Sequence, residues 1–143
     1  MEKITDKFAE FLNAELGLIM KSYNQNRTSI AKAGENGVDI SAALEDEQVL
    51  EAKIKAVKDL LKNKEIVTYC GKSPVVGLGS KVRISNGNNE RTVIVDGVGF
   101  RNDSMTVISY TSVVGSALLG KKEGDIIKPY KIEFKVEEVS DAW

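Results

Sequence analysis

The apolar residues of the N-terminal half follow the spacing of an α-helix, and this pattern ends near residue 70. They recur every three or four residues in two stretches, at Ile4, Phe8, Leu12, Leu16, Ile19 and Tyr23 and at Leu50, Ile54, Val57 and Leu61. Residues three or four apart lie on one face of a helix, so each stretch predicts an amphipathic helix. Neither helix is apolar on all sides, and each therefore needs a partner for its apolar stripe.

The segment between the two stretches has the composition of a tight reversal. Gly34, Asn36 and Gly37 tolerate positive φ angles, which a helix end and a chain reversal need. We expect Asp39 or Ser41 to cap the returning helix. The two helices therefore predict an antiparallel helical hairpin, packed as a coiled coil, whose turn forms an exposed tip.

The rest of the chain changes to strand and turn composition. Both prolines and eight of the twelve glycines lie after Gly71. Alternating and β-branched residues predict strands over four segments, Lys81–Ser85, Arg91–Val95, Met105–Ser109 and Lys131–Val139. One short helix is expected over Ser112–Leu119. The predicted fold is α+β: a helical hairpin over residues 1–70, then a small antiparallel sheet with one short helix over residues 71–143.

The composition excludes several kinds of chemistry. The chain has no histidine, so catalysis by a serine–histidine pair and histidine-ligated zinc are excluded. Its single cysteine, Cys70, cannot form an internal disulfide, and we interpret it as a buried or incidental thiol. Twenty basic and 21 acidic residues give a net charge of -1, which does not predict bulk attraction to nucleic acid. Without a long apolar segment or signal peptide, the chain is expected to be cytoplasmic and to have no membrane partner.

Acidic residues gather around the predicted turn. Residues 35–51 contain no Lys or Arg and six acids, Glu35, Asp39, Glu45, Asp46, Glu47 and Glu51. The helix dipole favours acids in the first turn of a helix, so a structural origin explains the pattern equally well. The functional interpretation is a carboxylate group that supplies ligands to a hard cation such as Mg²⁺. Because Mg²⁺ keeps several waters, such a tip is expected to share a metal with a partner's site and to hold none independently.

A further pattern lies around the predicted short helix. Ala117–Lys121 with Gly124 and Asp125 resembles the corresponding block of bacterial transcript-cleavage factors of the GreA/GreB family. The resemblance extends to four further segments, residues 76–82, 130–139, 46–54 and 64–67. It therefore covers most of the chain, and it implies that the C-terminal domain is FKBP-like.

The resemblance implies a function at RNA polymerase. In that family the C-terminal domain docks on the rim of the polymerase secondary channel, and two acids at the hairpin tip help the polymerase to hold its second Mg²⁺ and to cut backtracked RNA. It implies a catalytic role for the tip acids Asp39, Glu45 and Asp46. It implies polymerase binding by Ser112, Val113, Val114, Ser116 and Lys121. The protein would then not be an enzyme by itself and would have no cofactor of its own. It would act as a monomer close to the nascent RNA 3′ end, and DNA binding would be expected through its association with transcription.

The tip departs from the family pattern. Asp39 stands at the first acid position, but Ala42 stands at the second. The loop is also shorter, which brings Glu45, Asp46 or Glu47 nearer the tip as substitutes. Gly34 replaces a basic residue that commonly helps to hold the RNA. A close alternative is therefore a cleavage-inactive relative that occupies the channel and inhibits the polymerase.

Two other classes stay open. An FKBP-like fold can be a peptidyl-prolyl isomerase, although one Trp, four Tyr and four Phe in the whole chain leave few residues for an aromatic proline pocket. An adaptor protein whose hairpin dimerises through its apolar stripes is the other class.

Overall fold

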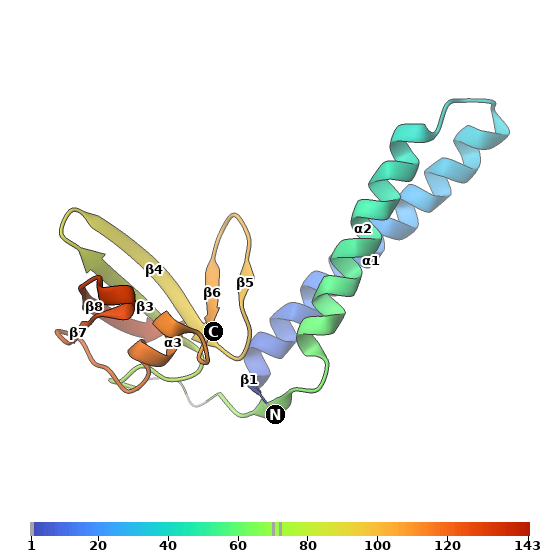
Figure 1. The fold of residues 1–143 in the computed structure, drawn as a ribbon. Coiled ribbons are helices and arrows are strands. Elements are labelled where there is room, and N and C mark those ends of the chain that lie inside the picture. The colour runs from blue at the N-terminus through green and yellow to red at the C-terminus, as the bar shows by residue number, and fades with distance from the viewer. Residues whose placement is uncertain (1, 70, 72) are drawn as a thin grey trace. The chain divides into compact units, whose positions relative to one another are not determined.

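The computed structural model describes residues 2–69, 71 and 73–143, so the thiol predicted for Cys70 lies outside the described residues. Figure 1 shows a helical hairpin and a sheet accompanied by one short α-helix. These elements confirm the predicted α+β class.

The chain divides into two compact units. One unit, Glu10–Lys62, is helical. The other combines Met1–Ala9 with Asn63–Trp143 and contains the sheet. The predicted hairpin, residues 1–70, is longer than the helical unit, because the segments before and after that unit belong with the sheet.

Two long helices account for the helical unit. α1 spans Asp6–Glu35 and α2 spans Ser41–Leu61, which confirms the helices that the two apolar stripes predict. On α2 the stripe residue Val57 is buried, whereas the stripe residue Ile4 lies in a strand that precedes α1. Within the described part of the chain, no helix is both long enough and apolar enough to cross a membrane.

Contacts between the two helices show that they run antiparallel. The Tyr23 hydroxyl donates a hydrogen bond to the Glu51 carboxylate over 2.9 Å, and the Asn26 amide donates to the carbonyl of Ala43 over 3.0 Å. Residues later in α1 therefore contact residues earlier in α2. These contacts are polar, so the half of the hairpin next to the tip does not rest on an apolar seam alone.

A six-stranded sheet forms the body of the other unit, in the order β5-β6-β4-β3-β8-β7. Its strands are β3 (Ser80–Asn86), β4 (Asn89–Asp96), β5 (Phe100–Arg101), β6 (Thr106–Ser109), β7 (Ile126–Ile127) and β8 (Phe134–Asp141). A separate parallel pair, β1 (Lys3–Thr5) and β2 (Glu65–Val67), places the residues before α1 beside the residues after α2. Neither strand of this pair was predicted.

The sheet is not wholly antiparallel, which corrects our prediction. β4 and β6 run parallel, with Ile94 opposite Val107 and Asp96 opposite Ser109. The other pairings in this sheet are antiparallel. Alternation of apolar and polar residues predicts a strand but carries no information about its direction, so the sequence pattern could not distinguish the two arrangements.

The core joins the sheet to helix α3 (Val113–Leu118). Leu118 is completely buried and belongs to a cluster with side chains from β3, β4 and β8. The buried members are Val76, Val82, Ile84, Val93, Val95, Leu118, Ile127 and Val136. Full burial of such a side chain stabilises a fold by about 1.5–3 kcal/mol. The core therefore fixes the position of α3 and of the face that α3 leaves exposed.

A buried aspartate ties the N-terminal strand to the sheet. Asp96, at the end of β4, is completely buried. Its carboxylate accepts hydrogen bonds from the N–H (3.0 Å) and the hydroxyl (2.6 Å) of Thr5, the N–H of Gly97 (2.7 Å) and the indole N–H of Trp143 (3.0 Å). The Trp143 ring in turn stacks on Phe8 at 5.2 Å between ring centres. Four donors satisfy a charge that would otherwise be costly to bury.

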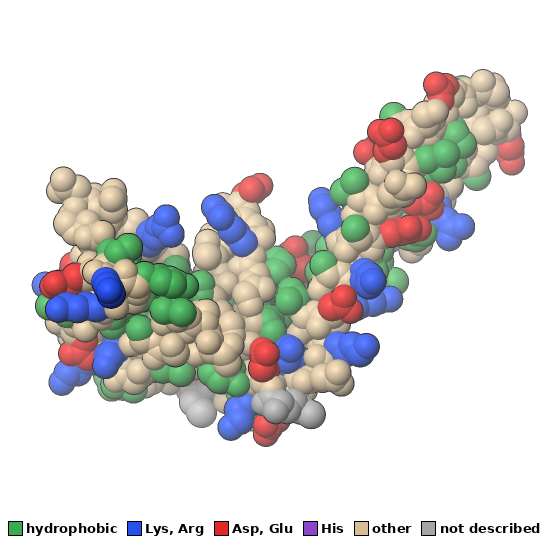
Figure 2. Space-filling view, viewed as in Figure 1, with side chains coloured by type: hydrophobic (Ala, Val, Ile, Leu, Met, Phe, Trp, Pro, Cys, Tyr) green, Lys and Arg blue, Asp and Glu red, His purple; other side chains and the backbone are tan. Residues whose placement is uncertain are grey.

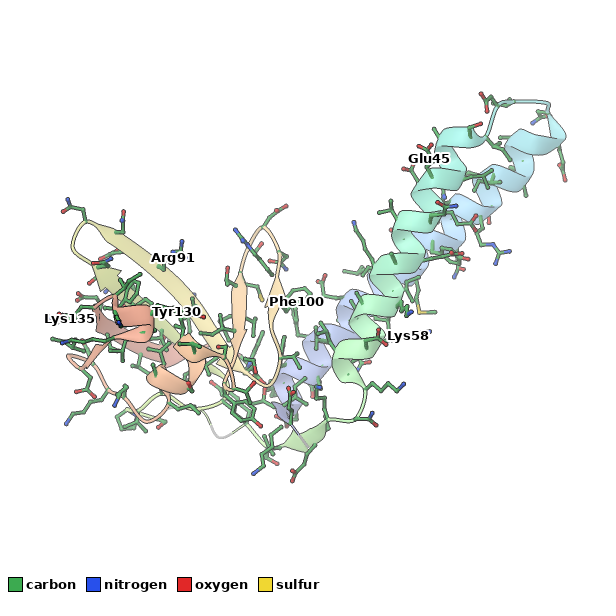
Figure 3. All side chains as sticks on the ribbon, in the orientation of Figure 1. Glu45, Lys58, Arg91, Phe100, Tyr130 and Lys135 are labelled. Atoms are coloured by element: carbon green, nitrogen blue, oxygen red, sulfur yellow. The ribbon has the colours of Figure 1, made fainter. Side chains whose placement is uncertain are left out.

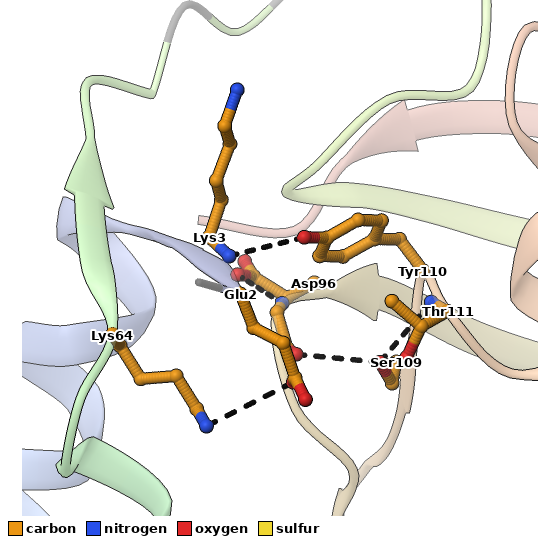
Figure 4. Close-up of polar contacts among 8 residues, drawn as sticks. Glu2, Lys3, Lys64, Asp96, Ser109, Tyr110 and Thr111 are labelled. Atoms are coloured by element: carbon orange, nitrogen blue, oxygen red, sulfur yellow. Dashed lines mark hydrogen bonds and ion pairs between the residues drawn. The ribbon is translucent and has the colours of Figure 1, made fainter.

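The chain passes very close to Gly97. A Cβ at this position would lie 1.9 Å from the carbonyl oxygen of Lys3. Further contacts hold the same segment in place (Figure 4): the Lys3 N–H donates to the Tyr110 hydroxyl over 3.1 Å, and Glu2 pairs with Lys64 at 3.8 Å. Only glycine fits between β1 and the end of β4.

Candidate functional site

Helix α1 ends in a turn that exposes the hairpin tip. Gly37 has a φ of 70°, and its N–H donates to the carbonyl of Gly34 over 3.1 Å. The N–H of Val38 donates to the carbonyl of Ala33 over 2.9 Å. These two bonds form the usual glycine-closed helix end and satisfy carbonyls that α1 would otherwise leave unpaired. Gly37 alone meets the predicted need for positive φ, since Gly34 lies inside α1 and Asn36 has a negative φ.

Asp39 is exposed at the tip and is held by the first residue of α2. Its Oδ1 accepts hydrogen bonds from the N–H (2.9 Å) and the hydroxyl (2.7 Å) of Ser41. These bonds, the backbone bond first, hold the pKa of Asp39 below its ordinary value, because they stabilise the carboxylate. The prediction that Asp39 or Ser41 caps α2 is wrong, because the cap position is Ile40 and no side chain makes a cap hydrogen bond there. Oδ2 of Asp39 has no hydrogen-bond partner among the described residues.

The other five acids of this segment fall into two groups. Glu47 and Glu51 are tied to α1, since Oε1 of Glu47 lies 3.4 Å from Nε of Arg27 and Glu51 accepts a bond from Tyr23. The second group is exposed and consists of Glu35, Glu45 and Asp46. Figure 3 shows Glu45 on α2, close to the tip. Glu47 is therefore engaged within the hairpin, whereas Glu45 and Asp46 remain accessible.

The tip does not assemble a metal centre from its own residues. Among the described residues, no three Asp, Glu, Cys or His side chains come together in a way that could hold a metal ion. Ala42, at the position of the second acid, is exposed in the first turn of α2. Mg²⁺ binds through one or two carboxylates and keeps several waters. Asp39 is thus an exposed carboxylate that is not part of such a group among the residues that the structure describes.

Polar side chains support the tip, and we did not predict them. Besides the Asn26 contact, the Arg27 guanidinium lies 5.7 Å from the centre of the Tyr23 ring and pairs with Glu47. A signal was present, because Asn26 follows Tyr23 by three residues and so continues the apolar stripe with a polar side chain. These contacts hold the two helices in register beneath Asp39.

Two of the predicted docking residues build helix α3. Ser112 is its N-cap: the hydroxyl accepts a bond from the N–H of Gly115 over 3.0 Å and donates to the carbonyl of Ser109 over 2.6 Å. Val114 is half-buried and packs against the core. Ser112 and Val114 therefore position the exposed side chains of α3 more than they offer surface of their own.

The other three docking residues do offer surface. Val113 is 47% exposed, Ser116 is exposed and Lys121 is half-buried. Ser116 and Lys121 line a groove of about 640 Å³ beside α3. Its lining comprises Ser116, Ala117, Leu119, Lys121, Ile126, Ile127, Lys128 and Glu133. The lining combines apolar side chains with two lysines and one glutamate.

The chain is similar to known transcription factors. A family model described as "Transcription elongation factor, GreA/GreB, C-term" matches residues 71–141. The chain is 30% identical over 134 residues to the transcription elongation factor GreA of Clostridium acetobutylicum, covering 87% of this chain and 85% of that protein. It is 31% identical over 108 residues to GreA of Mycoplasmopsis pulmonis, covering 72% and 68%. The crystal structure of GreA factor homolog 1 (Gfh1) of Thermus thermophilus is similar at 27% identity and a TM-score of 0.46, covering 96% of this chain and 97% of that one.

Proposed function

Because the chain belongs to the GreA/GreB family of transcription elongation factors, we propose that it binds RNA polymerase and places its hairpin tip in the secondary channel. The docking surface is the exposed side of α3, with Val113, Ser116 and Lys121 in contact. Ser112 and Val114 hold that helix in shape. The protein acts on the reaction of the polymerase and catalyses none by itself.

The geometry of Asp39 carries this proposal. The carboxylate is exposed, has its pKa lowered by the hydrogen bonds from Ser41, and leaves Oδ2 without a partner among the described residues. Such an oxygen can serve as one ligand of a Mg²⁺ ion in the polymerase, where the ion stabilises the attacking and leaving oxygens of the RNA phosphate. Glu45 and Asp46 lie in the following turn of α2 and add negative charge near the nascent RNA 3′ end. The tip thereby modulates elongation and supports RNA cleavage.

A second candidate function is inhibition without cleavage. Ala42 supplies no carboxylate at the second acid position, and the described residues form no cluster of three acids. A tip with one oriented carboxylate can occupy the channel without completing the metal site. The single feature that separates the two functions is therefore the number of tip carboxylates that reach the metal.

Stalled, backtracked elongation complexes test both functions. We expect RNA shortening with the wild type, loss of shortening with Asp39→Ala, and faster shortening with Ala42→Glu, because that change restores the second acid at an exposed position in the first turn of a helix. Slower elongation without RNA shortening would instead support the inhibitor. If the wild type changes neither cleavage nor elongation, the proposed function is wrong.

The isomerase class receives no support from the groove beside α3. A proline pocket needs aromatic walls, and the groove lining contains no aromatic side chain. We expect a proline-peptide assay to give no rate above background.

The adaptor class requires a dimer. We expect sedimentation to show a monomer at all concentrations.

A further inference from the structure

A short turn next to the groove has a backbone conformation that favours glycine. The 3-10 turn η1 (Pro129–Lys131) contains Tyr130 at a φ of 52° and Lys131 at a φ of 65°. Residues with a Cβ adopt this region rarely, because the Cβ approaches the carbonyl oxygen too closely. Among the described residues, Asn63 is the remaining non-glycine residue with positive φ, and asparagine tolerates it better than most side chains. The Ile132 N–H donates to the carbonyl of Pro129 over 3.0 Å, so Tyr130 and Lys131 occupy the two central positions of a tight turn between the antiparallel strands β7 and β8, where hairpin turns commonly have positive φ.

The Tyr130 side chain contributes little to the fold. It is 71% exposed, although tyrosine gains most when its ring is buried. Two isoleucines close to it in the chain, Ile126 and Ile132, are 53% and 46% exposed. Figure 3 shows Tyr130 on the turn beside β8. The turn therefore presents a large aromatic ring to solvent at a position where glycine or asparagine would suit the backbone better.

The turn η1 and the groove lie next to each other. Tyr130 lies in the chain between Lys128 and Glu133, which both line the groove, and η1 packs against α3. Val113 adds a further exposed apolar side chain one turn before Ser116 on α3. We call the groove together with Tyr130 and Lys131 the α3 groove surface.

The charge of the α3 groove surface indicates the chemistry of its partner. Lys121 and Lys128 line the groove and Lys131 lies in the turn, whereas Glu133 is the one acid in the lining. None of these three lysines has an ion pair among the described residues. Figure 2 shows cationic side chains beside apolar ones in this part of the sheet unit. A matching partner presents an apolar side chain with carboxylates around it.

We propose that Tyr130 is the aromatic anchor of the α3 groove surface, which receives an apolar side chain flanked by carboxylates on RNA polymerase. The inference rests on the proposed function, because it names residues and partner chemistry for the same docking event. The hydrogen-bonded turn of η1 fixes the backbone that carries the Tyr130 ring. Large aromatic anchors of this kind account for a major part of the affinity of many interfaces.

Two variants of the same residue test the anchor. Tyr130→Ala removes the ring but keeps the Cβ at positive φ, and Tyr130→Gly removes both. We expect each to weaken binding to core RNA polymerase by about thirtyfold or more, the loss typical of removing an interface anchor. Tyr130→Gly should also melt about 2 °C or more above Tyr130→Ala, because glycine relieves the strained φ. Lys131→Glu should weaken binding more at low salt than at high salt.

The control variant is Asn63→Gly, which relieves the third positive φ at a site that follows α2. It should leave the affinity for polymerase unchanged. If the wild type does not bind polymerase, the proposed function fails. If the wild type binds and both Tyr130 variants bind equally well, the anchor is wrong while the proposed function stands.

Discussion

Two aspartates show how differently the two units of this molecule use a carboxylate. Asp96, in the sheet unit, is completely buried and accepts four hydrogen bonds from Thr5, Gly97 and Trp143. Asp39, at the hairpin tip, is exposed and accepts bonds from one residue, Ser41, through one oxygen. The buried carboxylate has its partners within the fold, and the exposed one has an oxygen, Oδ2, without a hydrogen-bond partner among the described residues.

The difference separates support from function. Removing a buried acceptor leaves several donors unsatisfied, so its loss is felt as stability. Removing an exposed carboxylate leaves the fold nearly unchanged, so we expect its loss to change activity and not stability. Mutations at Asp96 should therefore change stability, and mutations at Asp39 should change activity.

The largest effect on stability is expected for Asp96→Ala. The change strands four buried donors, which should cost about 3–5 kcal/mol of unfolding free energy and lower the melting temperature by roughly 10 °C. Thermal unfolding followed by circular dichroism measures this. Asp96→Asn keeps one acceptor oxygen, so its melting temperature should lie between those of the wild type and Asp96→Ala. A melting temperature within 2 °C of the wild type for Asp96→Ala would show that the carboxylate is not a structural support.

Gly97→Ala should have the next largest effect. The added Cβ would meet the Lys3 carbonyl, so β1 must move away from the end of β4. We expect a loss of about 2–3 kcal/mol in urea unfolding. Gly17→Ala is the matched control, because no atom lies within 4 Å of a Cβ at that position, inside α1. It should stabilise the helix by about 0.5–1 kcal/mol, and equal effects at the two glycines would contradict the close contact.

Tyr69 should make the stability of the sheet unit depend on pH. Burial, together with the neighbouring Asp141 carboxylate, raises the pKa of Tyr69 to about 12 from its ordinary value of 10.0. The folded state thus holds the phenol proton more tightly than the unfolded state, so the stabilisation is complete below pH 10 and is lost as the pH rises toward 12. The difference between the urea midpoints at pH 8 and pH 11 should be smaller in Tyr69→Phe than in the wild type. An unchanged pH slope in that variant would contradict the assignment.

The smallest effect on stability is expected for Asp39→Ala. The lost bonds to Ser41 are exposed, so the melting temperature should change by about 1 °C or less. The same variant should lose RNA shortening in the backtracked-complex assay. A large drop in melting temperature without a change in that assay would reverse the roles that we assign to the two aspartates.

The comparison also shows which features can be predicted from sequence. The helices, the Gly37 turn and the acidic tip follow from local spacing and composition, and these were predicted. The β1–β2 pair and the Asp96 hydrogen bonds join residues far apart in the chain, and no local pattern encodes them. In the sequence Asp96 follows an apolar strand and reads as an ordinary strand end. The positive φ of Tyr130 was equally hidden, because tyrosine gives no signal for that conformation.

The candidate site was predictable to the same extent. The resemblance indicated Asp39 and the residues of α3, while the bond from Ser41 and the ion pair of Glu47 with Arg27 depend on how two helices pack. The sequence identifies six acids around the turn, but it does not tell which of them are engaged within the hairpin. The structure separates two engaged acids from those that remain exposed.

The most direct test of the account is gel filtration of the purified protein mixed with core RNA polymerase. If the protein is a polymerase-binding factor, it should elute with the polymerase at micromolar concentrations. Tyr130→Ala should then shift toward the position of the unbound protein, and Asp39→Ala should still co-elute. Elution of the wild-type protein entirely apart from the polymerase would contradict the central claim.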